Sequence, residues 1–317
     1  MSSVSVLLAT YEPRMDWLSD LLKSLCRQTL LPKEIIICDD GSSAKKYDEI
    51  ARTANKIITG QIEFRLYQNK ENLGSDKTFE RLTKLGKEEF FAYCDQDDIW
   101  EPQKLQLLVG AMESEIDTTM AYSDMSVIDQ NGEIKHKSMR QLRAGLEFAD
   151  GRNQAYRYTV VNCSAACAML VRADKAKQCI PFFEGVFCDQ WLAVCMAAWG
   201  RIIFVNRPLV RYRRHDDNQT SMMSGINNKK NYMEKRVRPA YELVYALQKR
   251  NIHYVYENHV EEFVKARMRK DIVQIWHYRR ICRKYAYFDI AICLLPEKIV
   301  SAMLKLFHGY TKADIQE

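Results

Sequence analysis

Residues 90–100, FFAYCDQDDIW, are the stretch of this chain that decides the fold. An apolar run of strand length ends there in three carboxylates within four residues, Asp95, Asp97 and Asp98. The run has no polar alternation, which is typical of a strand buried on both faces of a parallel sheet. In open sheets of this kind, ligands bind beyond the carboxyl ends of the strands. The stretch therefore predicts an α/β protein with a polar site at this strand end.

Strands and helices are expected to alternate around this stretch. Strands are predicted over 3–10, 34–40, 62–69 and 88–95, of which 34–40 and 88–95 contain continuous apolar runs, and a strand with a hairpin turn is predicted over 118–135. Helical spacing predicts helices over 16–29, 44–56, 75–85 and 101–114, the first capped by Asp16. This alternation predicts a mostly parallel sheet with helices on both faces.

The composition is that of a globular protein. The 317 residues carry a net charge of +6, and no uncharged apolar run is long enough to span a membrane. The start of the chain lacks the basic segment and cleavage site of a signal peptide. Ten cysteines are present without a CxxC pair or the spacing of a zinc site. We therefore expect reduced thiols and a cytoplasmic protein, with the inner face of the cell membrane as an alternative location.

Three polar clusters follow predicted strands: ATYEP at 9–13, DDGSS at 39–43 and DQDD at 95–98. Asp95 and Asp97 are two positions apart, so in extended chain their side chains point the same way. Two carboxylates that converge repel each other, and a divalent cation such as Mg²⁺ or Mn²⁺ offsets that repulsion. The alternative is an exposed acidic turn in which Asp98 caps the next helix.

The order of the motifs is more specific than any one of them. VSVLLATYEP, EIIICDDGSS, NLG, FFAYCDQDDIW, CDQW and YRRHDDNQT follow one another along residues 4–220. This pattern resembles the family-2 glycosyltransferases, which have the GT-A fold. CDQDDIW followed by a proline and a leucine-rich helix is most similar to the rhamnosyltransferase-like branch, which builds bacterial surface polysaccharide.

The resemblance implies a nucleotide site and a metal site. It assigns the nucleotide to Thr10, Tyr11, Glu12, Asp40, Asn72, Gly74 and Asp95. Asp40 would accept the ring N–H of a pyrimidine base, and Asp97 would bind Mn²⁺ or Mg²⁺. Thr78 departs from the asparagine expected at its place, which leaves the role of 75–78 open.

The resemblance also implies an inverting single displacement with Asp189 as the general base. Asp189 opens a predicted helix over 187–200, where a simple N-cap is the alternative. Trp191 would stack on the acceptor sugar or fill the core, and His215 would complete the metal site. Arg211, Arg213 and Asn218 are further candidates for contact with the diphosphate or the acceptor.

The chain divides in this interpretation into a catalytic domain, 1–225, and a basic helical region, 226–317. The helical region is expected to contact a membrane interface or to pack on the catalytic domain or on a second copy as a homodimer. Nucleic acid is not an expected partner. The predicted function is metal-dependent transfer of a sugar, with rhamnose suggested by the branch. The donor would be a dTDP- or UDP-sugar and the acceptor a glycan or lipid-linked glycan. The alternative is an inactive nucleotide-binding scaffold of the same fold.

Overall fold

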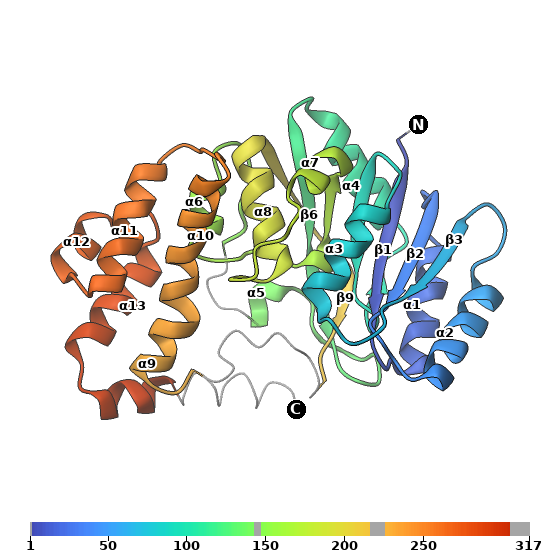
Figure 1. The fold of residues 1–317 in the computed structure, drawn as a ribbon, viewed down its shortest axis with the longest axis horizontal. Helices are drawn as coiled ribbons and strands as arrows, with labels where there is room; N and C mark the ends of the chain where they lie inside the picture. Colours follow the sequence, from blue (N-terminus) through green and yellow to red (C-terminus); the bar gives the residue numbers. More distant parts are fainter. Residues whose placement is uncertain (1, 143–146, 216–225, 305–317) are drawn as a thin grey trace. The chain divides into compact units, whose positions relative to one another are not determined.

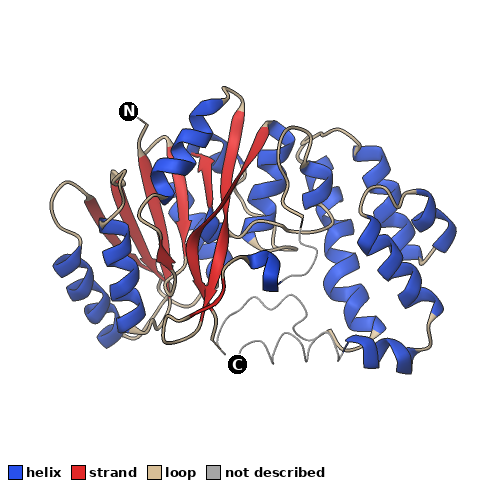
Figure 2. Cartoon of the chain, turned by 180° about the vertical axis from the view of Figure 1, so that it is seen from behind, coloured by secondary structure: helices blue, strands red, loops and turns tan. Residues whose placement is uncertain are grey.

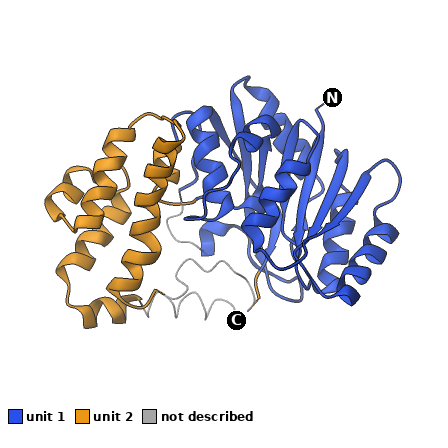
Figure 3. Ribbon diagram, viewed as in Figure 1, with its two compact units in different colours: residues 1–154, 163–213 blue, residues 155–162, 214–317 orange. Residues whose placement is uncertain are grey.

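The computed structural model describes residues 2–142, 147–215 and 226–304. The chain forms two compact units, residues 1–154 with 163–213 and residues 155–162 with 214–317 (Figure 3). The predicted boundary after residue 225 falls outside the described residues and stays a prediction.

The first unit contains a mixed, nine-stranded sheet with the order β3-β2-β1-β4-β8-β6-β9-β5, and β7 pairs with β6 (Figure 1). Neighbouring strands are parallel from β3 to β4 and between β6 and β9, whereas β8, β5 and β7 pair antiparallel. The strands are β1 Val4–Thr10, β2 Glu34–Asp39, β3 Glu63–Gln68, β4 Phe90–Cys94, β5 Ile99–Trp100, β6 Thr118–Ile128, β7 Ile134–His136, β8 Met169–Arg172 and β9 Arg201–Arg213.

Helices cover both faces of this sheet (Figure 2). On one face, alternate residues of β1, Val4, Val6 and Leu8, pack with leucines of α1 and α4. On the other face, the hydroxyl groups of Tyr93 on β4 and Thr83 on α3 form a hydrogen bond of 2.8 Å. The helices of this unit are α1 Met15–Cys26, α2 Ala44–Ile57, α3 Ser75–Leu85, α4 Lys104–Ser114, α5 Met139–Leu142, the 3-10 turn η1 Ala166–Ala168, α7 Ala173–Gln178 and α8 Cys188–Trp199.

The predicted GT-A-type sheet with helices on both faces is confirmed, and one local expectation is wrong. Asp16 does not cap α1: Arg14 occupies the N-cap position, and Asp16 lies in the first turn, paired with Arg14 at 2.6 Å. No pattern in the sequence predicted β8, a four-residue strand that pairs antiparallel with both β4 and β6.

The second unit is helical. The stretch 256–285, which has helical spacing throughout, is broken where Lys270 adopts φ +56° and ends one helix. Asp271 then caps the next helix by accepting the backbone N–H of Gln274. Across the described part of the chain, no helix is long and apolar enough to cross a membrane. The helices are α6 Ala155–Tyr158, α9 Lys229–Tyr232, the π-helical turn η2 Met233–Val237, α10 Arg238–Lys249, α11 Glu257–Arg269, α12 Ile272–His277, α13 Arg283–Leu294 and a further helix over 297–304.

Candidate active site

The ends of β1 and β2 are tied together by side-chain hydrogen bonds. The hydroxyl of Thr10 donates to Asp39 at 3.1 Å, and the hydroxyl of Ser42 donates to the same carboxylate at 2.6 Å. Ser42 also accepts the backbone N–H of Glu12, while Glu12 accepts the N–H of Ser43 at 2.7 Å. Tyr11, between Thr10 and Glu12, is 47 % exposed. Of the predicted nucleotide residues, Tyr11 and Glu12 therefore form an accessible rim at the strand ends, whereas Thr10 is buried beneath it.

Asp40 holds the N-x-G turn. Its carboxylate accepts the backbone N–H groups of Leu73 at 2.9 Å and Gly74 at 2.8 Å, and the side-chain amide of Asn69 at 2.6 Å. Gly74 has φ +88°, a conformation that favours glycine. The side chain of Asp40 is 4 % exposed. The contacts in the structure thus fold residues 72–74 onto β2, and a contact between Asp40 and a base stays a proposal.

Gly41 is required for this arrangement. A Cβ at this position would lie 2.6 Å from the carbonyl carbon of Glu71 and 2.8 Å from the nitrogen of Asn72. Its φ of +80° adds to the preference for glycine. The close approach of the DDGS turn to the N-x-G turn therefore depends on the absence of a side chain.

Gln96 joins the third cluster to the first. Its side-chain carbonyl accepts the backbone N–H of Tyr11 at 2.7 Å, and its amide donates to the carbonyl of Tyr11 at 3.2 Å. The three polar clusters predicted from the sequence are therefore one connected site at the carboxyl ends of β1, β2 and β4. Sequence reasoning did not assign a role to Gln96, because its two bonds join segments 85 residues apart.

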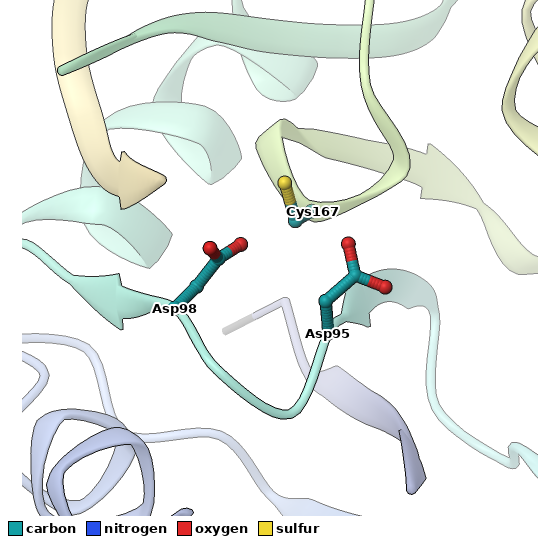
Figure 4. A group of neighbouring side chains, drawn as sticks. All are labelled: Asp95, Asp98 and Cys167. Atoms are coloured by element: carbon teal, nitrogen blue, oxygen red, sulfur yellow. The ribbon is translucent and has the colours of Figure 1, made fainter. Parts of the chain in front are cut away.

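Side chains of Asp95, Asp98 and Cys167 converge behind the loop that follows β4 (Figure 4). One potential ligand atom of each lies within 4.8 Å of the others. Burial, with the nearby carboxylates of Asp97 and Asp189, raises the pKa of Asp95 to about 7. Burial and the charges of Asp97 and Asp95 also hold the pKa of Asp98 well above its usual range. The surroundings thus disfavour the ionised form of these carboxyl groups, and a bound cation would favour it again.

The carboxylates of this cluster fit a hard divalent cation. Its partly exposed member is Asp95, and carboxylate oxygens suit Mg²⁺ and Mn²⁺. Asp97, the metal ligand expected from the sequence, is partly exposed but is not a member of this group of three, so its part in a metal site stays a proposal. Among the described residues, the buried Oδ2 of Asp98 has no hydrogen-bond partner. Burial raises the pKa of the Cys167 thiol well above its usual range, so the sulfur stays protonated and is a poor ligand for these ions.

Asp98 is neither a surface residue nor the cap of α4, whose N-cap position is Gln103. Its side chain is fully buried, and Oδ1 accepts the backbone N–H of Arg213 at 3.1 Å. Lys104 is buried beside it, with Nζ 3.0 Å from the centre of the Trp100 ring and 2.5 Å from the carbonyl of Cys167. Burial lowers the pKa of Lys104 to about 7. Asp98, Lys104 and Trp100 are therefore buried structural residues that pack next to residues 95–97.

Arg213 does not lie where a diphosphate ligand would be accessible, because its side chain is 2 % exposed. Its guanidinium donates to the main-chain carbonyls of Asp97, Asp129 and Gln130 at 2.8, 3.1 and 3.2 Å. Arg211, two residues earlier on β9, pairs with Glu101 at 2.7 Å and is 40 % exposed. The structure therefore gives Arg213 a positioning role that its residue type alone did not predict.

The first turn of α8 carries Asp189, after Phe187 at the N-cap position. Asp189 raises the pKa of Asp95, which places the two carboxylates in one electrostatic environment. Asp76, at the start of α3, accepts the backbone N–H of Cys188 at 2.9 Å. Asp76, which follows the N-x-G turn, therefore fixes the start of α8, the helix that carries the predicted general base Asp189. This role for Asp76 was missed, since 112 residues separate the two partners.

Trp191 has one of the two roles expected for it, that of a core residue. Its side chain is fully buried, and its indole N–H donates to the carbonyl of Cys179 at 2.9 Å. It fills the core and is not available to stack on a sugar. His215 follows β9 and belongs to the second unit, so its predicted part in the metal site stays a proposal. Asn218 lies outside the described residues.

The sheet order, the helices on both faces and the carboxylates at the strand ends define a protein of the GT-A fold. The sequence profile of Glycosyl transferase family 2 matches residues 5–177, more than half of the chain. The chain therefore belongs to glycosyl transferase family 2.

Similar proteins come from several microorganisms. An uncharacterized glycosyltransferase of Methanocaldococcus jannaschii is 29 % identical over 131 residues, 41 % of this chain and 44 % of the relative. A UDP-Glc:alpha-D-GlcNAc-diphosphoundecaprenol beta-1,3-glucosyltransferase of Escherichia coli is 22 % identical over 168 residues, 53 % of this chain and 59 % of the relative. The chain thus spans about half the length of these curated relatives.

Solved structures agree in fold. S. aureus TarS 1–349 in complex with UDP-GlcNAc superposes with a TM-score of 0.59, over 99 % of this chain and 89 % of TarS 1–349. The identity is 13 %, so this likeness establishes the fold and not the substrate.

Proposed function

We propose that this protein is an inverting, metal-dependent glycosyltransferase that uses a nucleoside diphosphate sugar. One observation carries the proposal: Tyr11, the N-x-G turn and Asp95–Asp97 meet at the carboxyl ends of three neighbouring strands, where Gln96 and Asp40 tie them together. This is the edge of an open sheet where nucleotides bind. The exposed ring of Tyr11 and the partly exposed carboxylates supply an aromatic surface and metal ligands there.

The chemistry follows from the charges at the site. Asp95 and Asp97 would hold Mg²⁺ or Mn²⁺, which when bound neutralises a diphosphate leaving group. Asp189 would accept the proton of the acceptor hydroxyl as that oxygen attacks the anomeric carbon. The bond from the anomeric carbon to the diphosphate oxygen breaks in the same displacement, so the configuration inverts. Asp189 lies in the first turn of α8, where the amide dipoles favour a negatively charged side chain.

Donor and acceptor are the finer parts of the proposal. The base would be a pyrimidine, as UDP or dTDP, with Asp40 and the rim of Tyr11 and Glu12 around it. The E. coli relative is named for UDP-Glc and a lipid diphosphate acceptor, and TarS is solved with UDP-GlcNAc. The branch resemblance points instead to rhamnose carried by dTDP. We propose a glycan or lipid-linked glycan of bacterial surface polysaccharide as the acceptor, reached at the inner face of the cell membrane.

The Asp97→Asn variant tests the catalytic proposal. Release of nucleoside diphosphate from the preferred donor with Mn²⁺ should fall roughly a hundredfold or more, since a catalytic metal supplies several kcal/mol of charge stabilisation. Glu133→Gln is a matched control, because its side chain is 74 % exposed on the β6–β7 turn. Wild-type turnover by a folded Asp97→Asn variant would overturn the assignment. Nucleotide binding without turnover in the unmodified protein would support the inactive scaffold instead.

A further inference from the structure

An exposed aromatic surface lies where α12 and α13 of the second unit meet. Val273 and Trp276 on α12 are 74 % and 52 % exposed, and Tyr287 on α13 is 48 % exposed. The ring centres of Trp276 and Tyr287 are 5.9 Å apart, so the two helices share one apolar surface. We call Val273, Trp276 and Tyr287, together with the basic residues Arg280, Arg283 and Lys284, the α12–α13 patch.

Packing within the unit does not explain this exposure. Ile275 already anchors α12, because it is fully buried in a cluster with Phe263 and Ala286. Val273 and Trp276 lie on the outer side of the same short helix. Neighbouring large apolar side chains on a surface, with polar residues around them, mark a site of interaction.

The surroundings of these apolar residues are basic. Residues 269–284 contain six lysines and arginines against one acidic residue, Asp271. The carboxylate of Asp271 caps α12 and is therefore committed to the backbone. Arg280, Arg283 and Lys284 are all exposed, and the guanidinium of Arg279 lies 4.3 Å above the Trp276 ring. The patch thus offers positive charge around an aromatic and aliphatic centre.

An anionic bilayer surface matches every feature of the patch. Tryptophan and tyrosine favour the level of the lipid headgroups, aliphatic side chains enter the acyl boundary, and lysine and arginine attract anionic lipids. Leu294, 67 % exposed, lies two helical turns after Tyr287 and extends the apolar stripe. A second copy of the chain, docked patch to patch, would bring like charges together. A nucleic acid would use the charges and the rings but not the aliphatic residues.

We propose that the α12–α13 patch binds the surface of membranes rich in anionic phospholipid, as a peripheral contact. This contact would bring the proposed enzyme to a lipid-linked acceptor. Only that consequence rests on the proposed function; the membrane contact itself does not.

The test is flotation of the full chain with vesicles of phosphatidylcholine, with and without phosphatidylglycerol. We expect binding to the anionic vesicles, weakened by salt. Changing Arg280, Arg283 and Lys284 together to glutamine should lower the partition coefficient roughly a hundredfold, because each basic residue near the surface contributes a factor of about five. Trp276→Ala should lower it as well, at every salt concentration.

Matched controls separate the patch from general charge. Lys45, Arg52 and Lys56 are exposed or partly exposed on α2 of the first unit, and their change to glutamine removes the same three charges elsewhere. Ile116, 95 % exposed in the first unit, is the apolar control as Ile116→Ala. Both control variants should bind vesicles like the unmodified protein.

Several results would overturn the proposal. These are no binding to anionic vesicles, equal weakening by the α2 control, and a dimer in sedimentation that Trp276→Ala dissociates while vesicle binding stays the same. Binding to single-stranded DNA that depends on Trp276, without vesicle binding, would assign the patch to nucleic acid. The Asp97→Asn variant should bind vesicles normally, so failure of the catalytic proposal and failure of the membrane proposal are distinguishable.

Discussion

Replacing Arg213 by methionine removes the side chain that holds two loops of the first unit against the end of β9. Its guanidinium donates to the carbonyls of Asp97, Asp129 and Gln130 at 2.8–3.2 Å. Methionine has a similar length but no donor, so the carbonyl of Asp97 would lose its hydrogen bond from Arg213, whereas the carbonyl of Asp129 would keep the backbone N–H of Gly132 at 3.1 Å.

The expected loss of unfolding free energy is about 1–3 kcal/mol, because a buried acceptor that loses its donor costs about that much. Gln130 is exposed, so water can replace its bond, and Asp129 keeps the N–H of Gly132, so the carbonyl of Asp97 accounts for most of the loss. Urea unfolding followed by far-UV circular dichroism measures it, as a lower midpoint at an unchanged m value.

Arg211→Met is the control for this prediction. Arg211 lies on the same strand, but its ion pair with Glu101 is 40 % and 30 % exposed. Exposed pairs contribute about 1 kcal/mol at most. Equal losses in the two variants would refute the view that Arg213 secures the loop at 95–98.

Three further predictions concern the same site. Burial and nearby carboxylates raise the pKa of Asp95 to about 7 in the folded protein, so between about pH 4 and pH 7 the folded state binds more protons than the unfolded state. Without metal, the melting temperature should therefore fall as the pH rises from about 4 to about 7. Asp95→Asn should flatten this slope, and an unchanged slope would contradict the pKa. Asp76→Ala removes the acceptor of the Cys188 N–H, so turnover should fall while the nucleotide Kd is kept; a matching loss of nucleotide binding would argue against positioning of Asp189. Trp191→Ala should lower stability by about 3–5 kcal/mol, as for a buried aromatic; normal stability with a raised acceptor KM would restore the stacking role.

The strand-end site could be predicted because its signal is local. Apolar runs such as FFAYC show two-sided burial directly, and the carboxylates follow within a few residues. The same holds for the turn at Gly74, whose φ of +88° agrees with the N-x-G pattern.

The supporting contacts could not be predicted, because they join distant segments. Arg213 has the residue type of a phosphate ligand, and only its burial under the loop at 95–98 shows that it binds backbone carbonyls. Trp191 was equally consistent with stacking or packing until its burial was known. The short strand β8 carries no periodic signal in four residues, and its place is set by pairing with β4 and β6.

The central claim is that the strand-end site binds a nucleoside diphosphate together with a divalent cation. The most direct measurement is the melting temperature with UDP, dTDP, GDP, CDP and ADP, each with and without Mn²⁺. We expect stabilisation by UDP or dTDP that requires the metal, since a ligand bound only to the folded state raises its stability. No stabilisation by any nucleotide, or the same stabilisation without Mn²⁺, would contradict it.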